Sequence, residues 1–398
     1  ARWADYIREP APGDTNDEIW VRSPREETIA LSSEELSHRG LLTAKELPNS
    51  SKLKLHWHVR RAPEGQGYPA GSVAVSLFFT NERKQHGSSS ADRDAVSAFQ
   101  VELELSCSAG FIARIHHLHQ KSSDDWDAKV NALQYRDALE FGIGHNVSVD
   151  AEVCDRRCQT LRTTWLPQAT VEKVKPSTND RVGGIELSME ELDQLASTSA
   201  EAVQDRLMPL VSSYRAWIEQ QRQTPDLKPD QRGTADQLLR LASSQADRIE
   251  KGIHALADDQ IRDAFAIANR VMAVAARRRF GPMQQKRPDE VAAPKWRPFQ
   301  LAFVLMNLRA IADPSCGERQ TVDLLFFPTG GGKTEAYLGL AAFTLVMRRF
   351  RHDGGPQSGG MSVLMRYTLR LLTLDQLGRA STLICALELE RQKQPTKL

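Results

Sequence analysis

The sequence has few cysteines and no long apolar run. Five Cys among 398 residues, irregularly spaced, are too few for a disulfide framework, and this suits a reducing cytosol. No apolar stretch reaches the roughly 18 residues that a membrane helix needs, and no signal-peptide pattern is present. We therefore expect a cytoplasmic protein that does not associate with membranes.

A strong charge of either sign is also absent. The formal net charge is +1, so bulk charge argues neither for nor against nucleic acid, and any nucleic-acid site must be a local patch. Hydrophobic residues at 40% and charged residues at 26% are typical of a globular protein. The length is sufficient for two or three domains.

The first part of the chain is predicted to be rich in β-strands. Apolar and polar residues alternate with the period of a half-buried strand, most clearly in Phe99–Cys107. The segment Lys84–Asp92 is predicted to be a loop. The other predicted strands are Leu53–Val59, Val73–Phe79, Asn146–Val153 and Thr170–Val174.

From about Ile185 the apolar period becomes helical. Ser188 and Glu191 form a capping-box signature for a first helix, which Pro209 is expected to kink or divide. After a linker at 220–233, a second helix is predicted to extend past Met272 and to stop at 281–282, a Gly-Pro pair. The predicted fold is thus α/β multidomain, with a β-rich domain at 1–180, a helical region at 181–290 and a third region at 291–398.

A glycine loop in the third region indicates nucleotide binding. It follows a short apolar run, Val322–Phe327, that predicts a strand, and it precedes the apolar stretch Ala336–Met347, which predicts a helix. Glycines allow successive backbone N–H groups to face one point, where the positive end of the helix adds to the attraction for phosphate. Lys333 is then expected to contact the β- and γ-phosphates of ATP, and Thr334 to hold Mg²⁺. The predicted loop residues are Thr329, Gly330, Gly331, Gly332, Lys333 and Thr334.

The loop departs from the general phosphate-loop pattern at one position. The strict pattern has Gly five residues before Gly332, where this chain has Phe327. The remaining Pro-Thr-Gly-x-Gly-Lys-Thr resembles the first motif of superfamily 2 helicases and translocases, which usually have Ala or Gly at the irregular position. A flexible loop without a ligand would give no reason for Lys-Thr at the helix start.

An Arg-x-aromatic-Gln element lies upstream of the loop. In superfamily 2 proteins such an element opens the first motor domain and reads adenine, and Arg297, Phe299 and Gln300 match it. The Gln300 amide has the donor and acceptor needed to select the base, and Phe299 could stack on it. The alternative is an ordinary helix start with Pro in its first turn and a surface Gln.

Downstream, a second apolar run precedes several cations and hydroxyls. Met361–Met365 predicts a buried parallel strand, and superfamily 2 helicases place a DNA-backbone element after the corresponding strand. Arg366, Thr368 and Arg370 are suited to that role, because such groups hold phosphates without reading sequence. An amphipathic helix with solvated arginines is an equally good interpretation.

Together, Asp323–Leu340 and Leu364–Gln376 resemble the DrmA family, the superfamily 2 helicase subunits of bacterial DISARM antiphage systems. Glu140–His145 also resembles a stretch that precedes the motor in that family. The resemblance implies a RecA-like ATPase lobe with a parallel sheet, DNA with a single-stranded end as substrate, and a DUF1998-type, DrmB-like partner subunit. Motor activity would use ATP and Mg²⁺.

A complete motor needs an acidic second motif, and this chain has no Asp-Glu pair after Thr334. The pair Asp289-Glu290 lies before the loop. We therefore expect an N-terminal portion of a larger protein that does not hydrolyse ATP productively alone. The alternative function is a nucleotide-switched DNA-binding scaffold that recruits a nuclease or methyltransferase, and an ATPase acting on protein also stays open.

Two weaker patterns remain. Cys154 and Cys158 could bind zinc with a nearby histidine, but the spacing fits no zinc finger. Arg277-Arg278-Arg279, with Lys286 and Arg287, could contact phosphates, although a solvated helix end is the commoner explanation.

Overall fold

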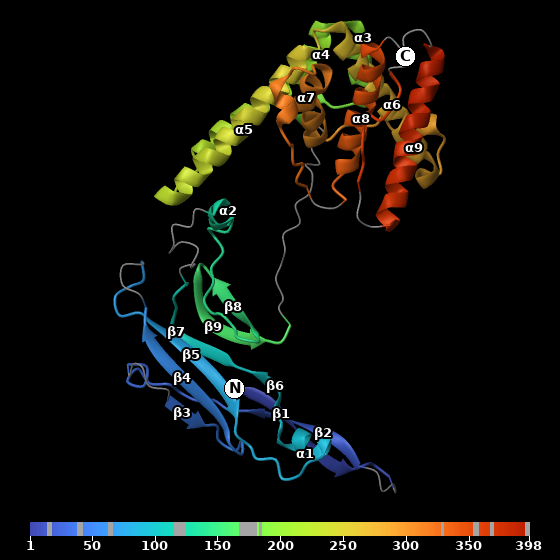
Figure 1. Ribbon diagram of the computed structural model, residues 1–398. Helices are drawn as coiled ribbons and strands as arrows, with labels where there is room; N and C mark the ends of the chain where they lie inside the picture. Colours follow the sequence, from blue (N-terminus) through green and yellow to red (C-terminus); the bar gives the residue numbers. More distant parts are fainter. Residues whose placement is uncertain are drawn as a thin grey trace. The chain divides into compact units, whose positions relative to one another are not determined.

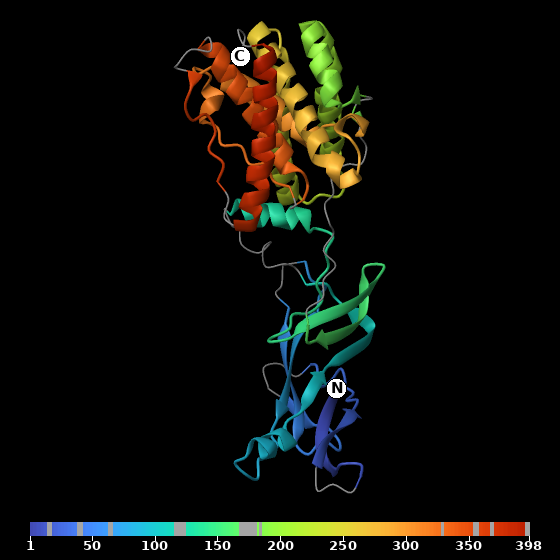
Figure 2. The same ribbon diagram turned by 90° about the vertical axis from the view of Figure 1, so that its right-hand side faces the viewer.

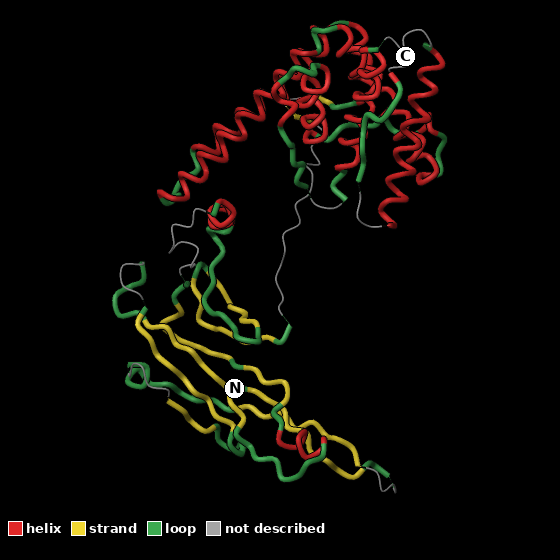
Figure 3. Tube along the Cα trace, in the orientation of Figure 1, coloured by secondary structure: helices red, strands yellow, loops and turns green. Residues whose placement is uncertain are grey.

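The computed structural model describes residues 1–13, 18–37, 43–62, 67–114, 125–166, 181–182, 185–327, 330–352, 358–366 and 370–394. The chain divides into two compact units, Ala1–Val171 and Glu172–Leu398. Strands dominate the first unit and helices the second (Figures 1 and 3), which confirms a mixed α/β protein with a β-rich N-terminal part. Every pairing between described strands is antiparallel, so the predicted parallel sheet is not seen among them.

The first unit contains three small antiparallel sheets, in the strand orders β2-β1-β6, β3-β4-β5 and β7-β9-β8. Two short helices, α1 (Ser90–Val96) and α2 (Trp126–Gln134), accompany them. The strands are β1 (Arg2–Pro10), β2 (Glu18–Glu26), β3 (Thr43–Glu46), β4 (Leu53–Arg61), β5 (Val73–Asn81), β6 (Phe99–Glu102), β7 (Glu104–Phe111), β8 (Ser148–Cys154) and β9 (Arg157–Thr164).

Three strand predictions are confirmed as β4, β5 and β8. Period-2 alternation sets one face of β4 and of β8 toward a core, whereas β5 is held by its pairing with β4 and packs Phe79 against a core. The predicted strand Phe99–Cys107 is divided instead. Leu103 donates its backbone N–H to the Thr163 side chain, so β6 pairs with β1 while β7 pairs with β9. The predicted loop Lys84–Asp92 ends in helix α1, because Ser89 and Asp92 form a capping box. The strand predicted at Thr170–Val174 lies outside the described residues.

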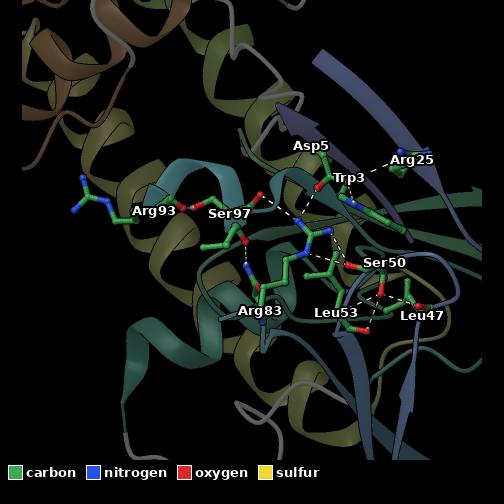
Figure 4. Close-up of polar contacts among 11 residues, drawn as sticks. Trp3, Asp5, Arg25, Leu47, Ser50, Leu53, Arg83, Arg93 and Ser97 are labelled. Carbon is green, nitrogen blue, oxygen red and sulfur yellow. Dashed lines mark hydrogen bonds and ion pairs between the residues drawn. The ribbon is translucent and has the colours of Figure 1, made fainter. Parts of the chain in front are cut away.

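A buried arginine joins separate segments of the first unit (Figure 4). The Arg83 guanidinium donates to the Asp5 carboxylate at 2.7 Å and twice to the Ser50 carbonyl, at 2.7 and 2.9 Å. A longer bond at 3.4 Å reaches the Ser97 carbonyl. The Arg83 side chain is only 9% exposed, so these acceptors replace its water. The clamp ties β1, the turn before β4 and the end of α1 to the segment after β5.

The second unit is a bundle of long helices (Figure 2), with a short hairpin of β10 (Arg181–Val182) and β11 (Ile185–Glu186) at its start. Its helices are α3 (Met189–Thr198), α4 (Ala200–Arg222), α5 (Pro229–Ala255), α6 (Asp259–Gln284), α7 (Pro298–Ala312), α8 (Lys333–Arg351) and α9 (Arg370–Lys393), with 3-10 turns η2 (Pro288–Glu290) and η3 (Gly317–Gln320). Among the described residues, no helix is both long and apolar enough to cross a membrane.

The helix boundaries correct two predictions. The first predicted helix begins at Ser188 as expected, but it divides at Ser199, whose extended backbone and hydroxyl start α4, and not at Pro209. Pro209 stays inside α4, where burial of neighbours such as Leu207 and Leu210 offsets its cost of about 3 kcal/mol. The second predicted helix also divides, at the Asp258 cap between α5 and α6, and α6 continues through the Gly-Pro pair to Gln284.

The helices of the second unit share one hydrophobic core that extends from Leu187 to Ala386. Helix α6 is central, because it packs against α3, α8 and α9 and is apolar nearly all round between Ala264 and Ala268. Two glycines elsewhere in the bundle permit close contact between neighbouring segments. A Cβ at Gly252 of α5 would meet the Leu305 carbonyl oxygen at 1.9 Å, and one at Gly339 of α8 would meet the Trp296 ring at 2.5 Å.

Neither apolar run beside the glycine loop is a strand. Residues 321–327 and 361–366 have no regular secondary structure and pair with no described strand, which contradicts both strand predictions. In the first run Val322, Leu324 and Phe326 are 86–93% exposed, and in the second Met361 and Leu364 are 74% and 81% exposed. A parallel strand needs a neighbouring strand, and a parallel sheet is covered on both faces. No described strand pairs with either run, and several large apolar side chains in each run face solvent.

Candidate nucleotide-binding site

The glycine loop lies at the start of α8, which begins at Lys333. Gly330 and Gly332 have left-handed backbone angles, with φ of 80° and 91°. Residues with a side chain rarely adopt this backbone conformation. The two glycines allow the chain to turn sharply just before the helix. Thr329 lies outside the described residues. The loop therefore leads directly into the positive end of a 19-residue helix, the arrangement that attracts phosphate.

The upstream element binds the backbone of the loop. Gln300 is 3% exposed, and its amide nitrogen donates to the Gly332 carbonyl at 2.7 Å while its amide oxygen accepts from the Arg297 N–H at 2.8 Å. The Arg297 guanidinium donates to the Gly331 carbonyl. A Cβ at Gly332 would come within 2.7 Å of the Gln300 amide nitrogen and 3.2 Å of the Arg297 guanidinium. A side chain at position 332 would therefore displace Gln300 and would be strained at this positive φ.

The irregular Phe327 has a partner in the same element. Its ring stacks on Phe299, with 4.4 Å between centroids and 6° between planes. Such a stack is worth about 0.5–1.5 kcal/mol beyond area burial. The Lys333 ammonium donates to the Phe327 carbonyl, so both ends of the loop meet at this residue. Selection of adenine by Gln300 and base stacking by Phe299 stay predictions, and the structure adds a contact of each with the loop.

Glu335 connects the loop to two other helices, a role that sequence reasoning missed. Its carboxylate accepts from Arg279 of α6 at 3.1 Å and from Arg379 of α9. The Arg379 side chain is 12% exposed, so this pair is largely shielded from solvent. A Glu directly after Lys-Thr was the available signal, but partners 56 and 44 residues away in the chain could not be inferred from it.

A buried ion pair anchors the segment that enters the loop. Arg248 of α5 binds Asp323 through two parallel hydrogen bonds at 2.6 and 2.8 Å, and the two side chains are 8% and 15% exposed. Hydrogen bonding to Asp323 raises the pKa of the Arg248 guanidinium above its ordinary value. The apolar run after Asp323 is thus fixed at its start although its side chains face solvent.

The predicted DNA-binding residues lie only partly within the described chain. Arg366 is exposed, Thr368 lies outside the described residues, and Arg370 is the first residue of α9. The Arg348 guanidinium of α8 donates to the carbonyls of Ser358, at 3.0 Å, and of Gly359, which fixes the chain before the second apolar run. The structure therefore leaves the grouping of Arg366, Thr368 and Arg370 as a prediction.

The other basic cluster is largely paired. Arg277 binds the Glu190 carboxylate at 2.6 and 3.0 Å, Arg279 binds Glu335, and Arg287 binds Glu290 at 3.1 Å. In the described part of the chain no three His, Cys, Asp or Glu residues converge to hold a metal ion, so the Cys154 and Cys158 pair gains no ligand set there.

Comparison with known proteins identifies a DISARM protein as a relative of this chain. No protein-family model matches the chain. It is 32% identical over 336 residues to the DISARM protein DrmA of Bacillus paralicheniformis, an alignment that covers 80% of this chain. The alignment spans 29% of the length of that relative. The comparison therefore does not extend to the function of the remaining part of DrmA. The chain is therefore a homologue of the DISARM protein DrmA that corresponds to a portion of it.

Proposed function

We propose that the chain belongs to an ATP-driven DNA helicase or translocase that acts in DISARM antiphage defence. The observation that carries the proposal is the glycine loop, which enters α8 at Lys333 with two left-handed glycines. The DrmA relative supplies the biological setting. The fold would then include a RecA-like ATPase lobe.

In this function each loop residue has a chemical task. The backbone N–H groups of 330–332 would surround the β-phosphate, and the Lys333 ammonium would leave the Phe327 carbonyl to neutralise charge on the γ-phosphate. Thr334, in the first turn of α8, has the hydroxyl oxygen that Mg²⁺ favours as a ligand. A Mg²⁺ ion held by Thr334 would reduce the negative charge of the phosphates.

The exposed apolar runs support the RecA-like part of the proposal. Val322, Leu324 and Phe326 turn three large apolar side chains to solvent immediately before the loop. Apolar surface of this kind is normally covered. We infer that both runs become parallel strands when further sheet strands of the longer protein lie beside them. Arg366, Thr368 and Arg370 would then follow the second strand and bind one DNA backbone, and a DrmB-like subunit would be the partner.

The test is ATP hydrolysis by the longer protein, with and without single-stranded DNA. We expect DNA to stimulate turnover and Lys333→Ala to abolish that stimulation, with a loss of at least about 100-fold. Lys393→Ala, at an exposed lysine of α9 that is paired with Glu390, is the matched control and should retain activity. Turnover indifferent to DNA would remove the motor and favour the nucleotide-switched scaffold.

A further inference from the structure

A groove of about 640 Å³ lies on one face of the sheet β3-β4-β5, far along the chain from the glycine loop. The antiparallel register places His56 opposite Phe78 and His58 opposite Ser76. Because successive residues of a strand point to opposite faces, every second residue of β4 and β5 lines the groove. These strand residues are His56, His58, Arg60, Ser76, Phe78 and Thr80.

The opposite face of β4 is buried and holds the strand in place. Trp57 and Val59, which alternate with the groove residues, are each 1% exposed. On the groove face, His56 Nε2 lies 2.9 Å from the Thr80 hydroxyl, and Arg60 donates to the Ser76 hydroxyl at 3.4 Å. The polar side chains of the groove are thus positioned by cross-strand hydrogen bonds on a rigid sheet.

A third imidazole comes from Glu140–His145, the segment that resembles a stretch of the DrmA family and has no role in the nucleotide site. His145 lines the groove, while Phe141 is buried in a small core with Cys158. A Cβ at Gly144 would meet the Val147 carbonyl oxygen at 1.9 Å, so a glycine is required for this backbone path. The segment is therefore anchored by Phe141 near its start, and His145 at its end places an imidazole at the groove.

The groove combines one guanidinium, three imidazoles and one aromatic ring. Among the described residues that line it, none is Asp or Glu. Glu82, which lies 3.9 Å from His56 Nε2, forms an ion pair with Lys54 at 2.5 Å. Phe78 is 47% exposed on this polar face. Because no three metal-binding side chains converge in the described part of the chain, the imidazoles do not form a metal site there.

We propose that this groove binds single-stranded DNA as a second contact, separate from the nucleotide site. Arg60 and the imidazoles would bind phosphate oxygens, the hydroxyls would add hydrogen bonds, and an unstacked base would stack on Phe78. A base within a duplex is already stacked on its neighbours, which favours a single strand over duplex DNA. The inference rests on the proposed action on DNA and names a surface that holds the strand without ATP.

The experiment measures binding of fluorescein-labelled dT20 to the 398-residue chain by anisotropy, without nucleotide. Phe78→Ala should weaken binding about tenfold, the effect of one lost stacking contact. Arg60→Ala should weaken it several-fold and lower the slope of log K against log salt by about one. The control Arg61→Ala removes the next arginine, which points to the opposite face, and should change binding less than twofold.

Crosslinking locates the strand independently. A 5-iodouracil oligonucleotide should crosslink to peptides that contain β4 or β5. Undiminished binding by both groove variants, or crosslinks confined to 366–376, would overturn the inference and leave the proposed motor intact. Competition by polyglutamate as strong as that by dT20 would show a general anion surface and would also overturn it. The Lys333→Ala variant should bind dT20 normally. Binding of dT20 at the groove is therefore tested independently of the proposed ATPase activity.

Discussion

The two units of this chain are stabilised in different ways. Among the described residues, the helical unit has a main core of thirty-two buried residues and a second core of three, whereas the sheet unit has two small cores of three buried residues each. In the sheet unit, a buried arginine and its acceptors join segments that the small cores do not join. The comparison indicates that substitutions of buried polar residues should reduce the stability of the sheet unit most. Substitutions that change packing volume should reduce the stability of the helical unit most.

The largest expected effect comes from breaking the arginine clamp. Arg83→Met should destabilise the sheet unit by about 3–5 kcal/mol, because the Ser50 carbonyl loses both bonds from Arg83 and Asp5 keeps only longer contacts, to Trp3 at 3.3 Å and Arg25 at 3.9 Å. Denaturant unfolding followed by limited proteolysis of each unit would measure the loss. Arg93→Met, at an exposed arginine in α1, is the matched control and should cost less than about 0.5 kcal/mol. A loss below about 1 kcal/mol for Arg83→Met would contradict the role of the clamp.

A smaller effect is expected from overpacking the helical unit. Gly339→Ala would place a Cβ 2.5 Å from the Trp296 ring and should destabilise the helical unit by about 1–3 kcal/mol. The ring cannot move away easily, because it is buried and its indole N–H donates a hydrogen bond to Asn269. Gly233→Ala in α5 meets nothing within 4 Å and should stabilise by about 0.5–1 kcal/mol through helix propensity. The same unfolding experiment compares the two. Equal shifts in both variants would show that the crossing at Trp296 is not tight.

The smallest effect distinguishes two roles of Phe299. Its stack on Phe327 predicts that Phe299→Ala weakens binding of fluorescent ATP and GTP analogues equally, by about two- to tenfold, because the loop loses its support. Phe303→Ala, which removes an edge contact with Tyr337, is the control and should leave both affinities nearly unchanged. A loss confined to the ATP analogue would show instead that Phe299 stacks on adenine.

Local patterns predicted much of the fold. Period-2 alternation located β4 and β8, a short apolar run located β5, and the Ser188–Glu191 signature located the start of α3. Predictions that depended on distant partners were wrong. The sequence around Phe99–Cys107 does not show that Thr163 divides the strand, and the two apolar runs contain nothing that tells which strands would lie beside them.

For the candidate site, sequence predicted the loop and its helix but not the surrounding contacts. The glycines and Lys333 are recognisable because phosphate binding needs residues at adjacent positions. The partners of Glu335 and Asp323 are on other helices, so no local pattern links Arg279, Arg379 or Arg248 to the site. Arg297 and Gln300 were identified by resemblance, and their bonds to the loop backbone became visible only in the structure.

The central claim is that the loop at the start of α8 binds a nucleoside triphosphate. The most direct measurement is titration of the 398-residue chain with a fluorescent ATP analogue and Mg²⁺, for the unaltered chain, Lys333→Ala and the control Lys393→Ala. We predict saturable binding that Lys333→Ala weakens at least tenfold and Lys393→Ala leaves unchanged. Equal affinity in all three proteins, or no binding by the unaltered chain, would contradict the claim.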